Sequence, residues 1–137
     1  MKKAITAVLG TLAIALPVAP ALAAAKKTIV SVKRVTGPQA AADRWGYVQV
    51  TLVVKKTTTI VGTHRKVTRK ITNVAVPVYP NHTDRSVFIN EQALPWLTQE
   101  VLQAQFNPNI NMISGATATS YAFHQSLQAA LLAAKRV

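Results

Sequence analysis

Apolar and polar positions along the chain predict strands in its first part and helices in its second. Residues 28–35, 44–54 and 66–79 are rich in Val and other β-branched residues, and they alternate apolar with polar positions. That period of two is typical of strands with one buried face. In the third segment Val74, Val76 and Val78 share a face, and Pro77 indicates an edge position or a strand end because proline donates no ladder hydrogen bond.

The second part has a helical pattern interrupted by breakers. Residues 85–105 read as helix, and Pro95 is expected to split them into two short helices because proline removes a helical hydrogen bond. Residues 107–109 break the pattern, and residues 110–113 read as a short extended run. A last helix is predicted over residues 120–135. Its apolar residues recur on one face: Phe123, Leu127, Ala130, Leu131 and Ala134. Strands followed by helices predict an α+β domain, with a small, mainly antiparallel sheet packed by helices.

The N-terminus has the features of an export signal. Lys2 and Lys3 precede an apolar run over residues 4–16, and the small residues of Ala21-Leu22-Ala23 suit cleavage. We therefore expect a signal peptide at 1–23, an N-terminal segment with the first strand at 24–45 and the main domain at 46–137. An exported protein of this kind would be extracellular, in the cell wall or in the periplasm. The alternative is an uncleaved membrane anchor, because residues 4–25 are long enough to span a bilayer.

Two features of the composition limit the chemistry. The 137 residues include no cysteine, which excludes disulfides, iron–sulfur clusters and thiolate zinc sites. The three histidines lack helical i, i+3 or i, i+4 spacing, and there are only four carboxylates. No metal site is therefore expected, and redox chemistry would depend on an organic cofactor.

The charge is strongly positive. Sixteen basic residues against four acidic ones give a formal net charge of +12, and loss of Lys2 and Lys3 would leave +10. Several basic pairs flank a Thr-rich hairpin tip at 57–63. They are either a solvated edge that prevents sheet pairing, or a surface that docks to an anionic membrane, a wall polymer or an acidic redox partner. Export argues against a specific nucleic-acid partner.

The strongest chemical signal is a hydroxyl-rich turn at residues 114–120. Gly115 permits positive φ there. The hydroxyls of Ser114, Thr117, Thr119 and Ser120 lie at the start of the last helix, where unpaired N–H groups and the helix dipole favour an anion such as phosphate. The alternative is an ordinary Ser/Thr helix cap.

The sequence S-G-A-T at 114–117, followed by x-T-S, resembles the flavinylation motif of the bacterial FMN-binding domain family, which is also found in the sodium-translocating NADH:quinone reductase. The resemblance extends over residues 47–134, through Gly46–Val50, the helical segment 84–105 and the tail 126–131. Small secreted single-domain members are the most similar. The resemblance implies FMN as cofactor and a flavin transferase that esterifies the FMN phosphate onto Thr117, with Ser114, Gly115, Ala116, Thr119 and Ser120 around it.

The implied function is an exported electron carrier between membrane and extracellular partners. The sequence shows no catalytic base or nucleophile pair, so a stand-alone enzyme is not expected. Arg85, Ser86, Asn90, Trp96 and Tyr121 are candidates to contact the flavin ring. Asn111 stands where the family usually has Asp, which leaves covalent and non-covalent binding both open. The alternative function is a non-redox domain of the same fold that docks through its basic hairpin.

Overall fold

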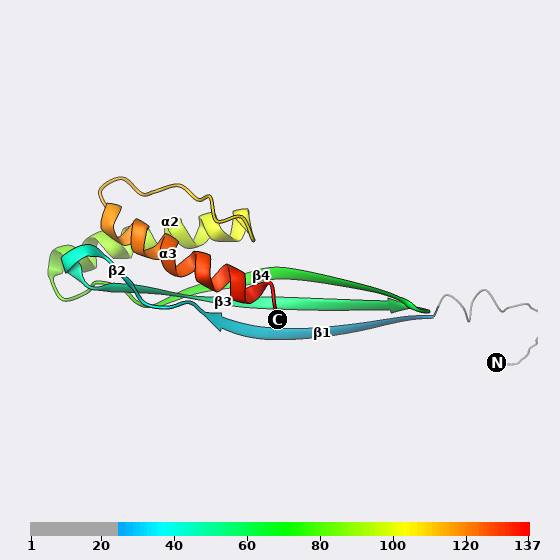
Figure 1. Ribbon diagram of the computed structural model, residues 1–137. Coiled ribbons are helices and arrows are strands. Elements are labelled where there is room, and N and C mark those ends of the chain that lie inside the picture. Colours follow the sequence, from blue (N-terminus) through cyan, green and yellow to red (C-terminus); the bar gives the residue numbers. More distant parts are fainter. Residues whose placement is uncertain (1–24) are drawn as a thin grey trace, which may run out of the picture. The chain divides into compact units, whose positions relative to one another are not determined.

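The computed structural model describes residues 25–137, so the predicted signal peptide lies outside the described residues. The chain divides into two units: the described part of the first comprises residues 25–29 and Thr57–Thr68, and the second comprises Val30–Lys56 and Arg69–Val137. The elements (Figure 1) are strands β1 (Lys26–Thr36) and β2 (Ala40–Ala41), 3-10 helix η1 (Asp43–Trp45), strands β3 (Tyr47–Val61) and β4 (His64–Val78), and helices α2 (Asp84–Ala104) and α3 (Thr117–Ala134).

The sheet is built around β3, which is hydrogen-bonded to each of the other three strands. Its pairing with β2 is antiparallel and places Ala40 opposite Val48. β3 and β4 meet at a two-residue turn, where Gly62 has φ +60, as a tight hairpin requires. Antiparallel strands followed by two long helices confirm the predicted α+β class.

Within the second unit, both helices cover the same face of the sheet (Figure 1). Alternate residues of β3 point into this layer and are fully buried, as the period of two predicts. The helices contribute the other half of the core. The largest apolar side chains there are Val48, Val50, Leu52 and Val54 of β3, Ile71 of β4, Leu97 and Val101 of α2, and Phe123 and Leu127 of α3.

A polar contact fastens α3 to the sheet. The backbone N–H of Val50 donates to Ser126 Oγ at 2.9 Å, and the Ser126 side chain is fully buried. Gly37 lies so close to this point that a Cβ would collide with the backbone oxygen of Ser126. The fold therefore requires both a small hydroxyl residue on α3 and a glycine after β1.

The predicted break at Pro95 is wrong, because α2 is one helix of 21 residues with Pro95 inside it. Pro95 is exposed, so the carbonyl left without its N–H partner lies on the solvent side. The opposite side of the same turns is buried, through Ala93, Leu94 and Leu97. Burial of that face keeps the helix continuous through the proline.

Other boundaries also differ from the prediction. Residues 43–45 form η1 rather than strand, residues 110–113 form no strand, and α3 begins at Thr117 rather than at 120. Ser120 Oγ accepts a hydrogen bond from the N–H of Ile113 at 3.1 Å, which holds the preceding loop against the first turn of the helix. At the other end of the loop, the side-chain amide of Gln105 is hydrogen-bonded to β4. Its Oε1 accepts from the N–H of Ile71, and its Nε2 donates to the carbonyl of Ile71. No helix within residues 25–137 is both long and apolar enough to cross a membrane.

Candidate functional site

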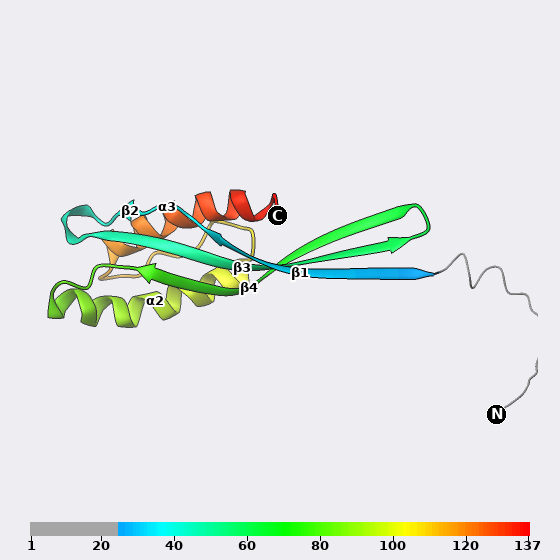
Figure 2. The same cartoon turned by 90° about the horizontal axis from the view of Figure 1, so that it is seen from below.

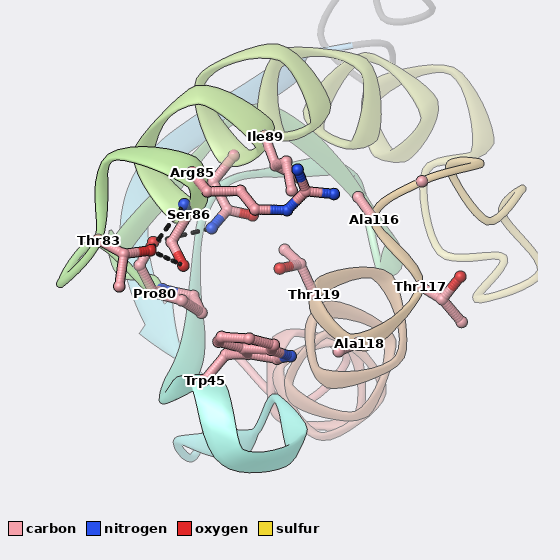
Figure 3. A pocket seen from close by; sticks show the side chains of 12 residues that line it. Trp45, Pro80, Thr83, Arg85, Ser86, Ile89, Ala116, Thr117, Ala118 and Thr119 are labelled. Atoms are coloured by element: carbon pink, nitrogen blue, oxygen red, sulfur yellow. Dashed lines mark hydrogen bonds between the residues drawn. The ribbon is translucent and has the colours of Figure 1, made fainter.

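A cavity of about 320 Å³ lies in the second unit between η1, the start of α2 and the start of α3 (Figure 3). Its lining includes one basic side chain, that of Arg85, and no carboxylate. The lining residues are Trp45, Pro80, Thr83, Arg85, Ser86, Ile89, Asn90, Gly115, Ala116, Thr117, Ala118 and Thr119.

The N-termini of α2 and α3 at this cavity differ in their capping. At α2, Thr83 Oγ1 accepts from the N–H of Ser86 at 3.0 Å, which is an ordinary side-chain cap. At α3 the capping position is Ala116, which offers no side-chain hydrogen bond. The first-turn N–H groups of α3, which have no intrahelical partner, therefore remain available at the cavity.

The turn before α3 depends on Gly115. Its φ of +83 is a left-handed conformation that side-chain-bearing residues rarely adopt, although a Cβ would meet no atom within 4 Å. Glycine is needed here for backbone conformation rather than for space. The turn is closed by a hydrogen bond from Ala116 N to the carbonyl of Ile113 at 3.1 Å.

The electrostatics of the cavity favour an anion. Arg85 reaches across from α2 toward the start of α3, and the Thr119 hydroxyl points into the same space (Figure 3). A guanidinium and a helix N-terminus both attract negative charge, and a guanidinium binds phosphate oxygens bidentately. The cavity thus has the donors that a phosphate ester needs.

Asn90 adds a buried polar side chain to the lining of the first cavity. Its side chain is only 2% exposed, and its Nδ2 donates to the carbonyl of Pro80 at 2.8 Å. Its Oδ1 is buried and has no hydrogen-bond partner in the protein. An unsatisfied buried acceptor costs about 1–3 kcal/mol, so a donor from a ligand or an ordered water at this oxygen would be stabilising.

A second cavity, of about 280 Å³, adjoins the first and shares Ile89, Gly115 and Ala116 with it. It extends along the first half of α2. Phe88 and Trp96, which are 64% and 69% exposed, line it together with Gln92, Ala93, Ile113 and Ser114. The two cavities form one groove that is electropositive at the start of α3 and aromatic along α2.

The structure brings most of the motif residues predicted as cofactor-binding to this groove. Gly115, Ala116, Thr117 and Thr119 line the first cavity, whereas Ser114 lines the second. Thr117 is exposed, and its side chain points away from Arg85 and Trp45 (Figure 3). Ser120 lines neither cavity, because its hydroxyl is buried and holds the loop at Ile113.

The residues predicted to contact the ring are divided. Arg85, Ser86 and Asn90 line the first cavity and Trp96 the second, whereas Tyr121, 62% exposed, lines neither. Asn111, the departure from the family pattern, donates through Nδ2 to Glu100 Oε2 at 3.1 Å.

Sequence reasoning missed part of the lining, most clearly Trp45. It was assigned to a strand, but it lies in η1, with the guanidinium carbon of Arg44 4.9 Å from its ring centre. The sequence signal for this turn was the Trp45-Gly46 pair, because glycine permits a turn at that point. In the structure Gly46 has φ +134. Phe88, Ile89, Pro80 and Thr83 gave no signal of their own.

Fold and groove together have the features of an α+β domain that receives a phosphate-bearing ligand with a flat apolar part. The model of the FMN-binding domain family matches residues 43–132, a span that contains every residue lining the two cavities. The chain belongs to this family, and FMN is its cofactor.

Comparison with curated proteins gave no significant match. Within residues 25–137, no group of three metal-ligating side chains is gathered in one place.

Proposed function

We propose that this protein is an exported electron carrier whose FMN is attached through a phosphoester to Thr117. The observation that carries the proposal is the groove at the S-G-A-T turn. It combines an uncapped helix start and Arg85 with a buried, unpartnered Asn90 Oδ1. These groups match the anionic and hydrogen-bonding parts of FMN.

Each part of the groove has a role in holding the cofactor. The first-turn N–H groups of α3, the Thr119 hydroxyl and Arg85 would bind the phosphate. Trp45, Ile89 and the aromatic side chains of α2 offer apolar surface for the ring system. Asn90 Oδ1 would accept from a hydroxyl or N–H of the cofactor. Bound FMN supplies the electron-transfer chemistry, and the protein supplies position and electrostatics.

Covalent attachment suits the exposed position of Thr117. Its hydroxyl is open to a modifying enzyme, and the first-turn N–H groups of α3 beside it have no side-chain cap. A phosphate monoester lacks a good leaving group, so the transferase would need a flavin dinucleotide as donor. The Thr117 Oγ1–P bond forms as the pyrophosphate bond breaks, the hydroxyl proton passes to a base, and a nucleoside monophosphate leaves. The ester would prevent loss of the flavin outside the cytoplasm.

The lining of the groove supports a carrier rather than a stand-alone enzyme. Neither cavity is lined by His, Asp or Glu, which are the usual proton-transferring groups. Such a site offers a bound flavin to a redox partner without proton chemistry on a second substrate. The partner is proposed to be a membrane electron-transfer complex or another redox protein.

The proposal is tested by coexpression with a flavin transferase, followed by intact mass and absorbance spectra. We expect the parent protein to gain the mass of FMN less one water and to be yellow. Thr117→Ala should lose the mass gain, whereas the control Thr98→Ala, on α2 outside both cavities, should keep it, because only Thr117 provides the ester oxygen. A parent protein without added mass but with bound flavin would refute the ester alone. Absence of any flavin would refute the carrier.

A further inference from the structure

The excess positive charge of the described chain lies on three strands. β1, β3 and β4 carry ten basic residues and no acidic one: Lys26, Lys27, Lys33, Arg34, Lys55, Lys56, Arg65, Lys66, Arg69 and Lys70. All other described residues balance, with four basic side chains (Arg44, Arg85, Lys135, Arg136) against four acidic ones (Asp43, Asp84, Glu91, Glu100). The sheet therefore carries the whole excess of +10.

Within the second unit, one face of the sheet is left uncovered by helices. The core-facing side of β3 is identified by fully buried Val50 and Leu52, so the residues between them point to the other side. Thr36 Oγ1 lies 3.0 Å from Thr51 Oγ1, which places the even-numbered residues of β1 on that same side. Figure 2 looks at the sheet from this side.

The uncovered face joins exposed apolar side chains to exposed basic ones. Val30, Val32 and Tyr47 are 52%, 62% and 54% exposed. Arg34, Lys55 and Lys70 are also exposed and belong to the same side by alternation, since Ile71 of β4 is buried in the core. We call these six residues the open face; none of them is acidic.

The chemistry of the open face selects its partner. A second copy of the chain would bring like charges together. An anionic polymer would neutralise the basic residues but leave the valines in water. A bilayer with anionic headgroups satisfies both, because long basic side chains reach phosphates while apolar side chains enter the interface. The groove is lined from the helix side, so it would stay accessible to a redox partner.

We propose that the open face docks the protein on anionic phospholipid. This surface is separate from the FMN groove, and the proposal does not depend on flavin attachment. The described part of the first unit, taken by itself, carries Lys26, Lys27, Arg65 and Lys66 and no acidic residue.

The test measures cosedimentation of the purified exported protein with phosphatidylglycerol-containing vesicles. Neutral phosphatidylcholine vesicles and polyphosphate in solution serve as comparison ligands. In R34S/K55S/K70S we expect partitioning to fall about a hundredfold, since each basic side chain near an anionic surface contributes about fivefold. The matched control K33S/K135S/R136S removes the same charge away from the open face and should fall much less. All variants share one N-terminus, so its contribution cancels.

A second variant distinguishes binding to lipid from binding to an anionic polymer. V30T/V32T keeps size and strand propensity but removes apolar surface, so it should weaken vesicle binding and leave polyphosphate binding unchanged. Equal losses in the two charge variants would overturn the open face as the site. Tight binding to polyphosphate without binding to anionic vesicles would overturn lipid as the partner. Circular dichroism that matches the parent protein shows that each variant is folded.

Discussion

At the scale of single residues, Asn90 and Ser126 show how much depends on one buried polar atom. Ser126 Oγ supplies the partner that Val50 N–H would otherwise lack, and it does so where α3 touches the sheet. Asn90 differs from Ser126, because its Oδ1 is buried and accepts no hydrogen bond from the protein. The first residue stabilises the fold, whereas the second leaves an acceptor that a bound donor could satisfy.

Replacing Asn90 by Leu is expected to weaken non-covalent FMN binding about two- to tenfold, since it removes one buried acceptor worth about 0.5–1.5 kcal/mol. Flavin fluorescence titration on a Thr117→Ala background measures this without interference from the ester. Thr98→Ala is the control, because Thr98 lies on the same helix and only bonds the carbonyl of Pro95. Equal FMN affinity in the Leu variant and its parent would contradict the role of Asn90.

Ser126→Ala is expected to lower the free energy of unfolding by about 1–3 kcal/mol, because the buried N–H of Val50 is left without a partner. Urea denaturation of the apoprotein measures the change. Ser114→Ala, at an exposed turn position, should change stability by less than about 0.5 kcal/mol. A loss at Ser126 no larger than that at Ser114 would mean that Val50 finds another partner.

At the scale of elements, α2 was the clearest error of sequence reasoning. Local preference at Pro95 favours a break, yet the apolar residues Leu94, Leu97 and Val101 on both sides of the proline are buried on one face. The stabilisation from burying that face exceeds the loss of one hydrogen bond on the exposed side. A period of two in the strands needed no such correction, because propensity and burial favoured the same structure.

Pro95→Ala should therefore raise the free energy of unfolding, by about 1–2 kcal/mol, since alanine restores the helical N–H while the unfolded chain gains some freedom. The helix already exists in the parent protein, so helicity by circular dichroism should stay the same. The midpoint of urea denaturation reports the change. A lower midpoint would show that proline stabilises α2 through its packing or through the unfolded state.

At the scale of the whole molecule, the excess charge lies on the strands, and the sequence predicts an N-terminal export signal. If residues 1–23 are removed on export, the mature chain begins at Ala24 with a formal net charge of +10. All of that excess then lies on the sheet, while the FMN groove lies among the helices.

We expect the protein in the producing cells to be recovered outside the cytoplasm with Ala24 as its first residue. Cell fractionation followed by intact mass and N-terminal sequencing checks this. Substituting Ala21 and Ala23 with Leu should block cleavage, because the processing site requires small side chains. A cytoplasmic protein that retains Met1 or residue 2 at its N-terminus would contradict export.

Local patterns in the sequence determined most of the strand segments, the existence of both helical regions and the positive φ at Gly115. Each depends on residues close together in the chain, so periodicity and turn chemistry suffice. Tertiary structure alone decided the continuity of α2, the place of Trp45 in the groove, the isolation of Asn90 Oδ1 and the side of the sheet that stays open. Those properties arise from burial between segments far apart in the chain, a contribution to the free energy that no local window of sequence contains.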